Sequence, residues 1–228
     1  PACGRYGRMT GQRPTLIVVA GPNGSGKTSL TTKVLQHKWI EGCTYINPDN
    51  IARDVYGDWN SYDAVMAAAK HAEAERERCL RLRESMAFES VLSASDKIDF
   101  IKRAKDEGYF IRLFFVGTDH PSINAARVTQ RVMEGGHDVP IPKIISRYSK
   151  SIANCAAAAS FADRAYIYDN SVDGDEPKLL FRTVEGEIVK VYEAIHDWAQ
   201  VIVETLPHGR EPSHDDEHDH ANDNTPSP

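Results

Sequence analysis

The sequence predicts an α/β fold in which a doubly wound, mostly parallel sheet carries helices on both faces. Short apolar segments alternate with amphipathic stretches of helical length, which is the order that crossover connections produce. The first apolar run, 15–20, is continuous and rich in β-branched residues, as in a strand buried on both faces. The chain has 228 residues, 41% of them hydrophobic, which suits one domain with a sizeable core.

The elements follow in order along the chain. The expected strands are 15–20, 44–46, 88–92, 109–116 and 165–168, with 178–183 as an antiparallel edge strand. The expected helices run from the glycine-rich turn to about 37, then 61–86, 95–105, 121–133, 142–159 and 187–206. Ser95-Asp96 is expected to cap the third of these helices, and Gly108 to close it.

Composition divides the chain into three parts. Residues 1–13 are expected to be a flexible segment, 14–206 the folded domain, and 207–228 a disordered, acidic, His-rich tail. The tail holds one arginine against six acidic residues, or −5 of the net charge of −6, so the folded part is nearly neutral. This balance argues against a nucleic-acid partner. Four scattered cysteines and the lack of a long apolar run indicate a cytoplasmic protein with reduced thiols and no membrane span.

The glycine-rich turn matches the P-loop pattern Gly21-x-x-x-x-Gly26-Lys27-Thr28 in full. It predicts a P-loop nucleotide-binding fold for ATP or GTP and Mg²⁺. Lys27 would contact the β- and γ-phosphates, and Thr28 would be a Mg²⁺ ligand. The nucleotide-binding residues are expected to be Gly21, Pro22, Asn23, Gly24, Ser25, Gly26, Lys27, Thr28 and Ser29. A turn that binds nothing is the alternative, but the apolar strand before it and the helix after it favour the P-loop.

Two carboxylates lie in or just after predicted strands and are expected at the edge where ligands bind in open α/β sheets. Asp49 lies 22 residues after Lys27 and could take the proton of an attacking hydroxyl as a general base. Alternatively, Asp49 caps a helix that begins at Asn50. Glu89 is interpreted either as a substrate contact or as a satisfied polar residue at a strand end.

Arginines and one turn complete the candidate site. Arg127 and Arg131 share a helix face, and the planar guanidinium suits phosphate oxygens, although either could form a surface ion pair. Arg147 and Arg53 are further candidates for phosphate contacts. Asp169-Asn170 ends the last core strand, where it could touch the nucleotide base or simply form a turn.

On these residues the chain resembles the zeta-toxin family of P-loop kinases, in particular the branch labelled predicted ABC-type ATPase or kinase. The resemblance covers roughly 15–171. Its most specific part is Arg127-Val128-x-x-Arg131-Val132-x-x-Gly135-Gly136-His137-x-Val139-Pro140, followed by Arg147-Tyr148 and Tyr168-Asp169-Asn170-Ser171.

The resemblance implies a cytoplasmic kinase that moves the γ-phosphate of ATP or GTP to the sugar 3′-hydroxyl of UDP-N-acetylglucosamine, with an antitoxin protein as a partner. It implies Asp49 as the catalytic aspartate, Glu89 in contact with substrate or helping to organise Mg²⁺, and two arginines that clamp the phosphates. Arg131 is the first, with Arg147 or Arg127 as the second. Ser146 departs from the family, because close relatives often carry a second arginine before Arg147.

Alternatives stay open for the lid and for the function. The helical lid expected over the site, 135–142, could be a plain loop between helices. The chain could be a kinase of another acceptor, such as a nucleoside, an antibiotic or an RNA end, or a nucleotide-gated switch protein with little transferase activity.

Overall fold

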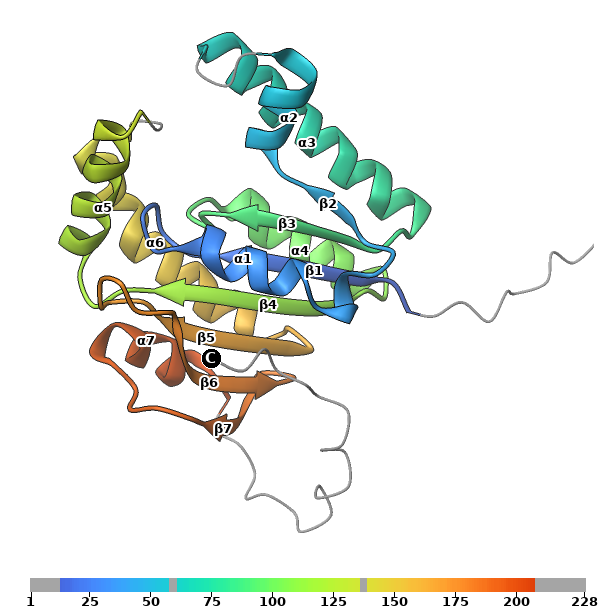
Figure 1. Cartoon of the computed structure of the whole chain (residues 1–228). Helices are drawn as coiled ribbons and strands as arrows, with labels where there is room; N and C mark the ends of the chain where they lie inside the picture. Colours follow the sequence, from blue (N-terminus) through green and yellow to red (C-terminus); the bar gives the residue numbers. More distant parts are fainter. Residues whose placement is uncertain (1–12, 58–60, 136–138, 208–228) are drawn as a thin grey trace, which may run out of the picture.

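The structure, a computed structural model, describes residues 13–57, 61–135 and 139–207. Its centre is a seven-stranded sheet in the order β2-β3-β1-β4-β5-β6-β7 (Figure 1). The strands are β1 (Thr15–Ala20), β2 (Thr44–Ile46), β3 (Met86–Ser90), β4 (Phe110–Gly117), β5 (Arg164–Asp169), β6 (Lys178–Val184) and β7 (Glu187–Val191). The first five in chain order are parallel, and β6 and β7 add antiparallel pairs at one edge. The predicted fold class is confirmed.

Helices cover both faces of this sheet (Figure 1). They are α1 (Lys27–Leu35), α2 (Pro48–Tyr56), α3 (Tyr62–Leu82), α4 (Ser95–Asp106), α5 (Pro121–Met133), α6 (Ile141–Ala159) and α7 (Asp197–Thr205), with a short 3₁₀ turn at Lys38–Ile40. Within the described ranges, no helix is both long and apolar enough to cross a lipid bilayer.

Strand β1 is buried on both faces, and this explains its uninterrupted apolar sequence. Leu16 and Val18 belong to the larger core, which includes residues of α4, α6 and α7. Ile17 and Val19 belong to a smaller core with Leu30 of α1. Alternate side chains of a strand point to opposite faces, so a strand between two helical layers needs apolar residues at every position.

The prediction of one C-terminal helix over 187–206 is wrong in its first half. Residues 187–191 form strand β7, which pairs antiparallel with β6, and only α7 is helical. Glu185 and Gly186 between the two strands both have positive φ, 50° and 86°, as in the tight turns whose twist suits a hairpin. The β-branched residues of 187–191 then favour the strand.

Smaller differences concern element ends. Strand β3 begins at Met86, two residues before its predicted start, because α3 ends at Leu82 with Arg83 in the left-handed conformation. Helix α4 has Ala94 as its N-cap, without a side-chain cap, so the predicted cap by Ser95-Asp96 is wrong. The predictions for 1–12, for 136–138 of the lid and for the tail from 208 onward lie outside the described residues.

Candidate active site

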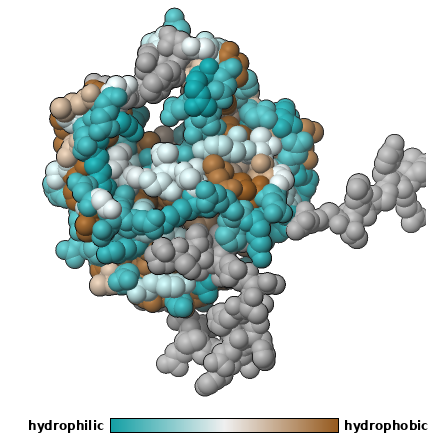
Figure 2. Space-filling view, viewed as in Figure 1, coloured by the Kyte–Doolittle hydropathy of each residue, from teal (hydrophilic) through white to brown (hydrophobic). Residues whose placement is uncertain are grey.

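The carboxyl ends of the parallel strands meet at one edge of the sheet, and the candidate site is built there. Helix α2 and the start of α3 rise from this edge on one side, and α5 with the start of α6 on the other (Figure 1). In the space-filling view the surface is hollowed below the α2–α3 pair (Figure 2). The crevice outside the carboxyl ends is where ligands bind in such sheets.

The P-loop joins β1 to α1 and leaves the start of that helix open. Its N-cap, Gly26, has φ 93° and offers no side-chain cap, and the first turn holds no acidic residue. The first N–H groups of α1 therefore have no side-chain acceptor at the cap, as an anion site at a helix N-terminus requires. Thr28 and Ser29 lie exposed in this turn.

Two glycines of the loop are required by close contacts as well as by backbone angle. At Gly24 (φ 77°) an added Cβ would lie 2.4 Å from the carbonyl oxygen of Asn124. At Gly26 it would lie 2.2 Å from Nδ2 of Asn170. The loop is thus clamped by neighbouring segments that leave no room for a side chain.

The clamping segments hold the loop through hydrogen bonds. Asn124 Nδ2 on α5 donates to the Asn23 carbonyl at 2.8 Å, and Asn170 Nδ2 after β5 donates to the Ser25 carbonyl at 2.9 Å. Arg147 on α6 donates to Asn23 Oδ1 at 3.3 Å. Asn124 was not predicted as a site residue, because a single helical asparagine carries no signal of what it contacts.

Lys27 is the point at which the candidate charges converge. Its Nζ donates to the carbonyl oxygens of Gly21 and Pro22, both at 2.9 Å. Burial lowers the pKa of Lys27 to about 8; Glu89 and Asp49 oppose this shift, whereas Arg131 and Arg147 add to it. Four charged residues from α2, β3, α5 and α6 therefore act electrostatically on Lys27 of α1 at this edge of the sheet.

Asp49 lies in the first turn of α2 and is not its cap. The N-cap is Asn47, whose Oδ1 accepts a hydrogen bond from the backbone N–H of Asp49 at 2.8 Å. The alternative in which Asp49 caps a helix from Asn50 is therefore wrong. Within the described ranges, no side-chain hydrogen bond or ion pair engages the Asp49 carboxylate, which is exposed.

Glu89 is the penultimate residue of β3 and has one hydrogen-bond partner among the described residues. Tyr45 OH on the neighbouring strand donates to Glu89 Oε1 at 2.8 Å. Asn47 Nδ2 in turn donates to Tyr45 OH at 3.0 Å. Tyr45 and Asn47 are two further residues that the sequence analysis did not single out.

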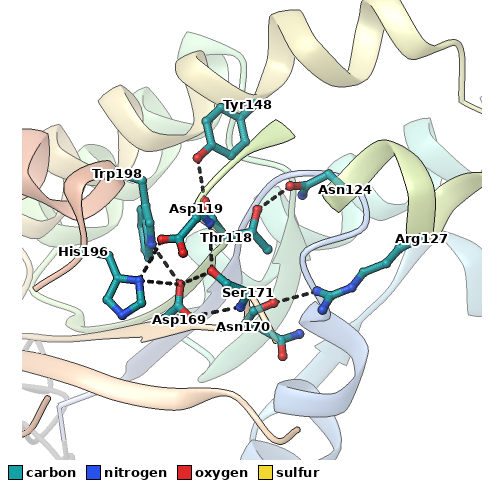
Figure 3. A network of polar contacts seen from close by, with 10 residues as sticks. All are labelled: Thr118, Asp119, Asn124, Arg127, Tyr148, Asp169, Asn170, Ser171, His196 and Trp198. Carbon is teal, nitrogen blue, oxygen red and sulfur yellow. Dashed lines mark hydrogen bonds and ion pairs between the residues drawn. The ribbon is translucent and has the colours of Figure 1, made fainter. Parts of the chain in front are cut away.

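Arg127 is oriented differently from Arg131 and Arg147. Its guanidinium contacts Asp173 at 2.6–2.7 Å. It also donates to the Asn170 carbonyl at 2.7 Å (Figure 3). In this structure Arg127 holds the loop after β5. Arg53 is also paired, with the adjacent Asp54, on the exposed side of α2.

The side chains of Asp169 and Asn170 contact different parts of the protein. Asp169 is buried and accepts hydrogen bonds from Ser171 N, from Ser171 Oγ and from Trp198 Nε1 of α7 (Figure 3). Its carboxylate is therefore occupied by hydrogen bonds within the protein. Asn170, the next residue, reaches the P-loop. The predicted turn chemistry is present, and it connects α7 to the phosphate loop.

The segment after β4 is tied into the same network (Figure 3). Tyr148 OH donates to the Thr118 carbonyl, and the Thr118 hydroxyl donates to Asn124. His196 Nδ1 lies 2.7 Å from Asp119 Oδ1. Partial burial alone would lower the pKa of His196, but the hydrogen bond to Asp119 and the charge of Asp169 raise it overall.

The residues present fit a nucleotide with Mg²⁺. Ser25 Oγ in the loop is buried without a hydrogen-bond partner in the described part of the chain, an unmet polar group of the kind a ligand satisfies. The uncapped start of α1, the Lys27 ammonium and the Thr28 hydroxyl are the donor set that a triphosphate and its metal ion require.

The fold and site define a P-loop phosphotransferase. A family model described as zeta toxin matches residues 5–173, and the chain belongs to the zeta toxin family. An uncharacterised protein of Haemophilus influenzae (strain ATCC 51907 / DSM 11121 / KW20 / Rd) is 30% identical over 132 residues, which are 58% of this chain and 91% of that protein.

Two solved structures share the fold at low identity. The AvrRxo1-ORF1:-ORF2 structure with ATP matches with a TM-score of 0.60 and 23% identity, over 87% of this chain and 64% of that chain. The present chain thus spans just under two thirds of that protein's length. A structure from the PezAT chromosomal toxin-antitoxin system of Streptococcus pneumoniae matches with a TM-score of 0.54 and 15% identity, over 88% and 81% of the two chains.

Proposed function

We propose that this chain transfers the γ-phosphate of ATP or GTP to a hydroxyl group of a nucleotide sugar such as UDP-N-acetylglucosamine. The observation that carries the proposal is the convergence of Asp49, Glu89, Arg131 and Arg147 on Lys27. Two carboxylates and two guanidiniums beside a P-loop lysine are what in-line phosphoryl transfer to an alcohol needs. A protein that only sensed the nucleotide would not need a carboxylate positioned to take a proton.

Lys27 and the start of α1 bind the β- and γ-phosphates in this mechanism. Thr28 would hold Mg²⁺, which neutralises phosphate charge when it is bound. Arg131 and Arg147 stabilise the negative charge that spreads over the transferred group. Arg147 also contacts Asn23 of the loop, which supports its proposed role beside the bound phosphates.

Asp49 accepts the proton of the attacking hydroxyl. Its carboxylate is exposed and carries no competing side-chain partner among the described residues, so it can approach a substrate. A general base of this kind contributes roughly 10²- to 10⁴-fold to the rate.

The proposals for the acceptor and for the protein partner are based on family membership. Membership of the zeta toxin family supports a UDP-sugar as acceptor and an antitoxin as partner. The PezAT structure, described as a toxin-antitoxin system, supports the same kind of partner for this chain. We also assign residues 14–206 to one catalytic domain.

The experiment that tests this function offers UDP-N-acetylglucosamine, other UDP-sugars and a nucleoside to the protein with ATP and Mg²⁺. Mass spectrometry then looks for a gain of one phosphate. The proposal predicts a phosphorylated UDP-sugar with wild-type protein and a strongly reduced yield with Asp49→Asn. Phosphorylation of the nucleoside alone would show that the acceptor is a nucleoside and not a UDP-sugar. Formation of free phosphate alone would contradict the kinase proposal.

A further inference from the structure

We propose that Tyr45 is a positioning residue for phosphoryl transfer, because its hydroxyl group couples Glu89 of β3 to the helix turn that carries Asp49. The inference rests on the proposed function and extends it to a residue outside the known motifs of the sequence. Tyr45 does not touch substrate in this account. It acts through the two carboxylates that do.

Strand pairing brings these side chains to one face of the sheet. Strands β2 and β3 are parallel, and Tyr45 lies opposite Ala87. Glu89 is two residues beyond Ala87, and Asn47 is two residues beyond Tyr45. Since side chains alternate along a strand, all four point to the face that carries α1. The ring of Tyr45 packs against the smaller core on that face, and its hydroxyl group extends toward the site.

Three hydrogen bonds join the two carboxylate-bearing segments through Tyr45. Asp49 N–H donates to Asn47 Oδ1 at 2.8 Å, Asn47 Nδ2 donates to Tyr45 OH at 3.0 Å, and Tyr45 OH donates to Glu89 Oε1 at 2.8 Å. Each link fixes the next. The cap uses the carbonyl oxygen of the Asn47 amide, so its NH₂ group faces the phenol. The phenol oxygen accepts that bond and directs its own proton to Glu89.

The electrostatic environment keeps Tyr45 as the donor in its hydrogen bond to Glu89. Burial raises the pKa of Tyr45, and the charges of Glu89 and Asp49 raise it further, against the opposing hydrogen bond from Asn47. The phenol is therefore protonated throughout the pH range of enzyme assays. It remains a hydrogen-bond donor to Glu89 and adds no third negative charge beside the two carboxylates.

A consequence for catalysis follows from where Glu89 and Asp49 lie. Both carboxylates raise the pKa of Lys27, and in the proposed function Lys27 binds the γ-phosphate, so that function places both beside the reacting groups. Displacements of about 1 Å in such groups can cost on the order of 10²-fold in rate. Phenylalanine at position 45 would fill the same space in the core but would release Glu89 from β2. The loss should therefore appear in turnover rather than in folding.

The test compares Tyr45→Phe with Tyr166→Phe in the full chain. Tyr166 is a matched control, because it lies in the same smaller core and its hydroxyl accepts a hydrogen bond from Arg112 away from the P-loop. We expect Tyr45→Phe to lower kcat by roughly 10- to 100-fold. We expect its KM for ATP to stay within about twofold, and Tyr166→Phe to keep kcat. Equal kcat in wild type and Tyr45→Phe would overturn the inference.

A second comparison separates positioning from a general loss of structure. If Tyr45 acts through Glu89, Tyr45→Phe should cause little further loss of kcat in the Glu89→Gln background. A loss of the same factor in both backgrounds would contradict that route. A matching fall in Tm and in ATP affinity would show a structural role instead.

A crystal structure of Tyr45→Phe supplies a readout that is independent of the acceptor. The inference predicts a displaced Glu89 carboxylate with the sheet unchanged, and an unmoved Glu89 would contradict it. If wild-type protein phosphorylates no acceptor, the proposed function fails, whereas the coupling of Tyr45 to Glu89 is still decided by this structure.

Discussion

Asn170, the residue after β5, donates a side-chain hydrogen bond to the carbonyl oxygen of Ser25 in the phosphate loop, 2.9 Å away. This contact links the last parallel strand to the loop after the first. Asp169 beside it accepts a hydrogen bond from Trp198 of α7, so α7 is connected to the P-loop through Asp169 and Asn170 (Figure 3). The nucleotide loop is therefore shaped by contacts from distant parts of the chain.

Replacing Asn170 should weaken nucleotide binding without unfolding the protein. Asn170→Ala removes the bond to Ser25 and leaves that buried carbonyl short of a donor, at a cost of about 1–2 kcal/mol. We expect the Kd for ATP, measured by calorimetry, to rise by roughly 5- to 30-fold. Asn154→Ala is a matched control, since Asn154 donates a similar bond to the Leu92 carbonyl. An unchanged Kd in Asn170→Ala would show that the loop holds its own shape.

Lys27→Ala should abolish phosphate transfer. The β- and γ-phosphates lose the P-loop ammonium group, whereas the core is untouched, so Tm should change little. Single-turnover assays with radiolabelled ATP measure the transfer. Near-normal turnover with normal ATP affinity would refute the assignment of this loop to the phosphates.

Asp49→Asn should separate binding from chemistry. The amide keeps the size of the side chain but cannot take a proton, so kcat should fall by about 10²-fold or more. ATP affinity and Tm should stay close to wild type, because Asn47, and not Asp49, caps α2. A large fall in both ATP affinity and Tm would show that Asp49 has a structural role instead.

His196 should make stability depend on pH. Its folded-state pKa is raised by Asp119 and Asp169, so its stabilising effect is complete below the unfolded-state pKa of about 6.5 and is lost as pH rises through the folded-state value. We therefore expect His196→Gln to lower the free energy of unfolding more at pH 5.5 than at pH 8.5, as measured by urea denaturation. His71→Gln on α3 provides the control. An equal loss at both pH values would contradict the charged contact.

Local sequence was sufficient to predict the P-loop and the five parallel strands. A glycine pattern between an apolar strand and a helix leaves few alternatives, and apolar runs such as 15–20 need burial on both faces. The hairpin at Glu185-Gly186 was missed, because 187–206 was interpreted as one helical pattern and the positive φ of both turn residues is not visible in a single sequence.

The supports of the site could not be predicted for a different reason. Asn170 was predicted to touch the nucleotide base or to form a turn, but its hydrogen bond to the P-loop was not predicted. That contact, and those of Asn124 and Tyr45, join segments that lie far apart in the chain and exist only once the sheet order is known. Asp49 shows the same limit on a smaller scale. Asp49 caps α2 only if the helix begins at Asn50. The helix instead begins at Pro48 with Asn47 as its N-cap, which leaves the Asp49 side chain in the first turn.

The fate of the γ-phosphate distinguishes a kinase from a protein that only binds or hydrolyses the nucleotide. Wild-type protein, Lys27→Ala and Asp49→Asn are incubated with Mg²⁺, a metabolite extract containing UDP-sugars and ATP labelled at the γ-phosphate. Mass spectrometry then follows the label. The account predicts that wild-type protein moves the label onto an organic acceptor, and that both variants fail to do so at a comparable rate. Label found only as ATP and inorganic phosphate, in equal proportions for wild type and Asp49→Asn, would contradict a kinase that uses Asp49.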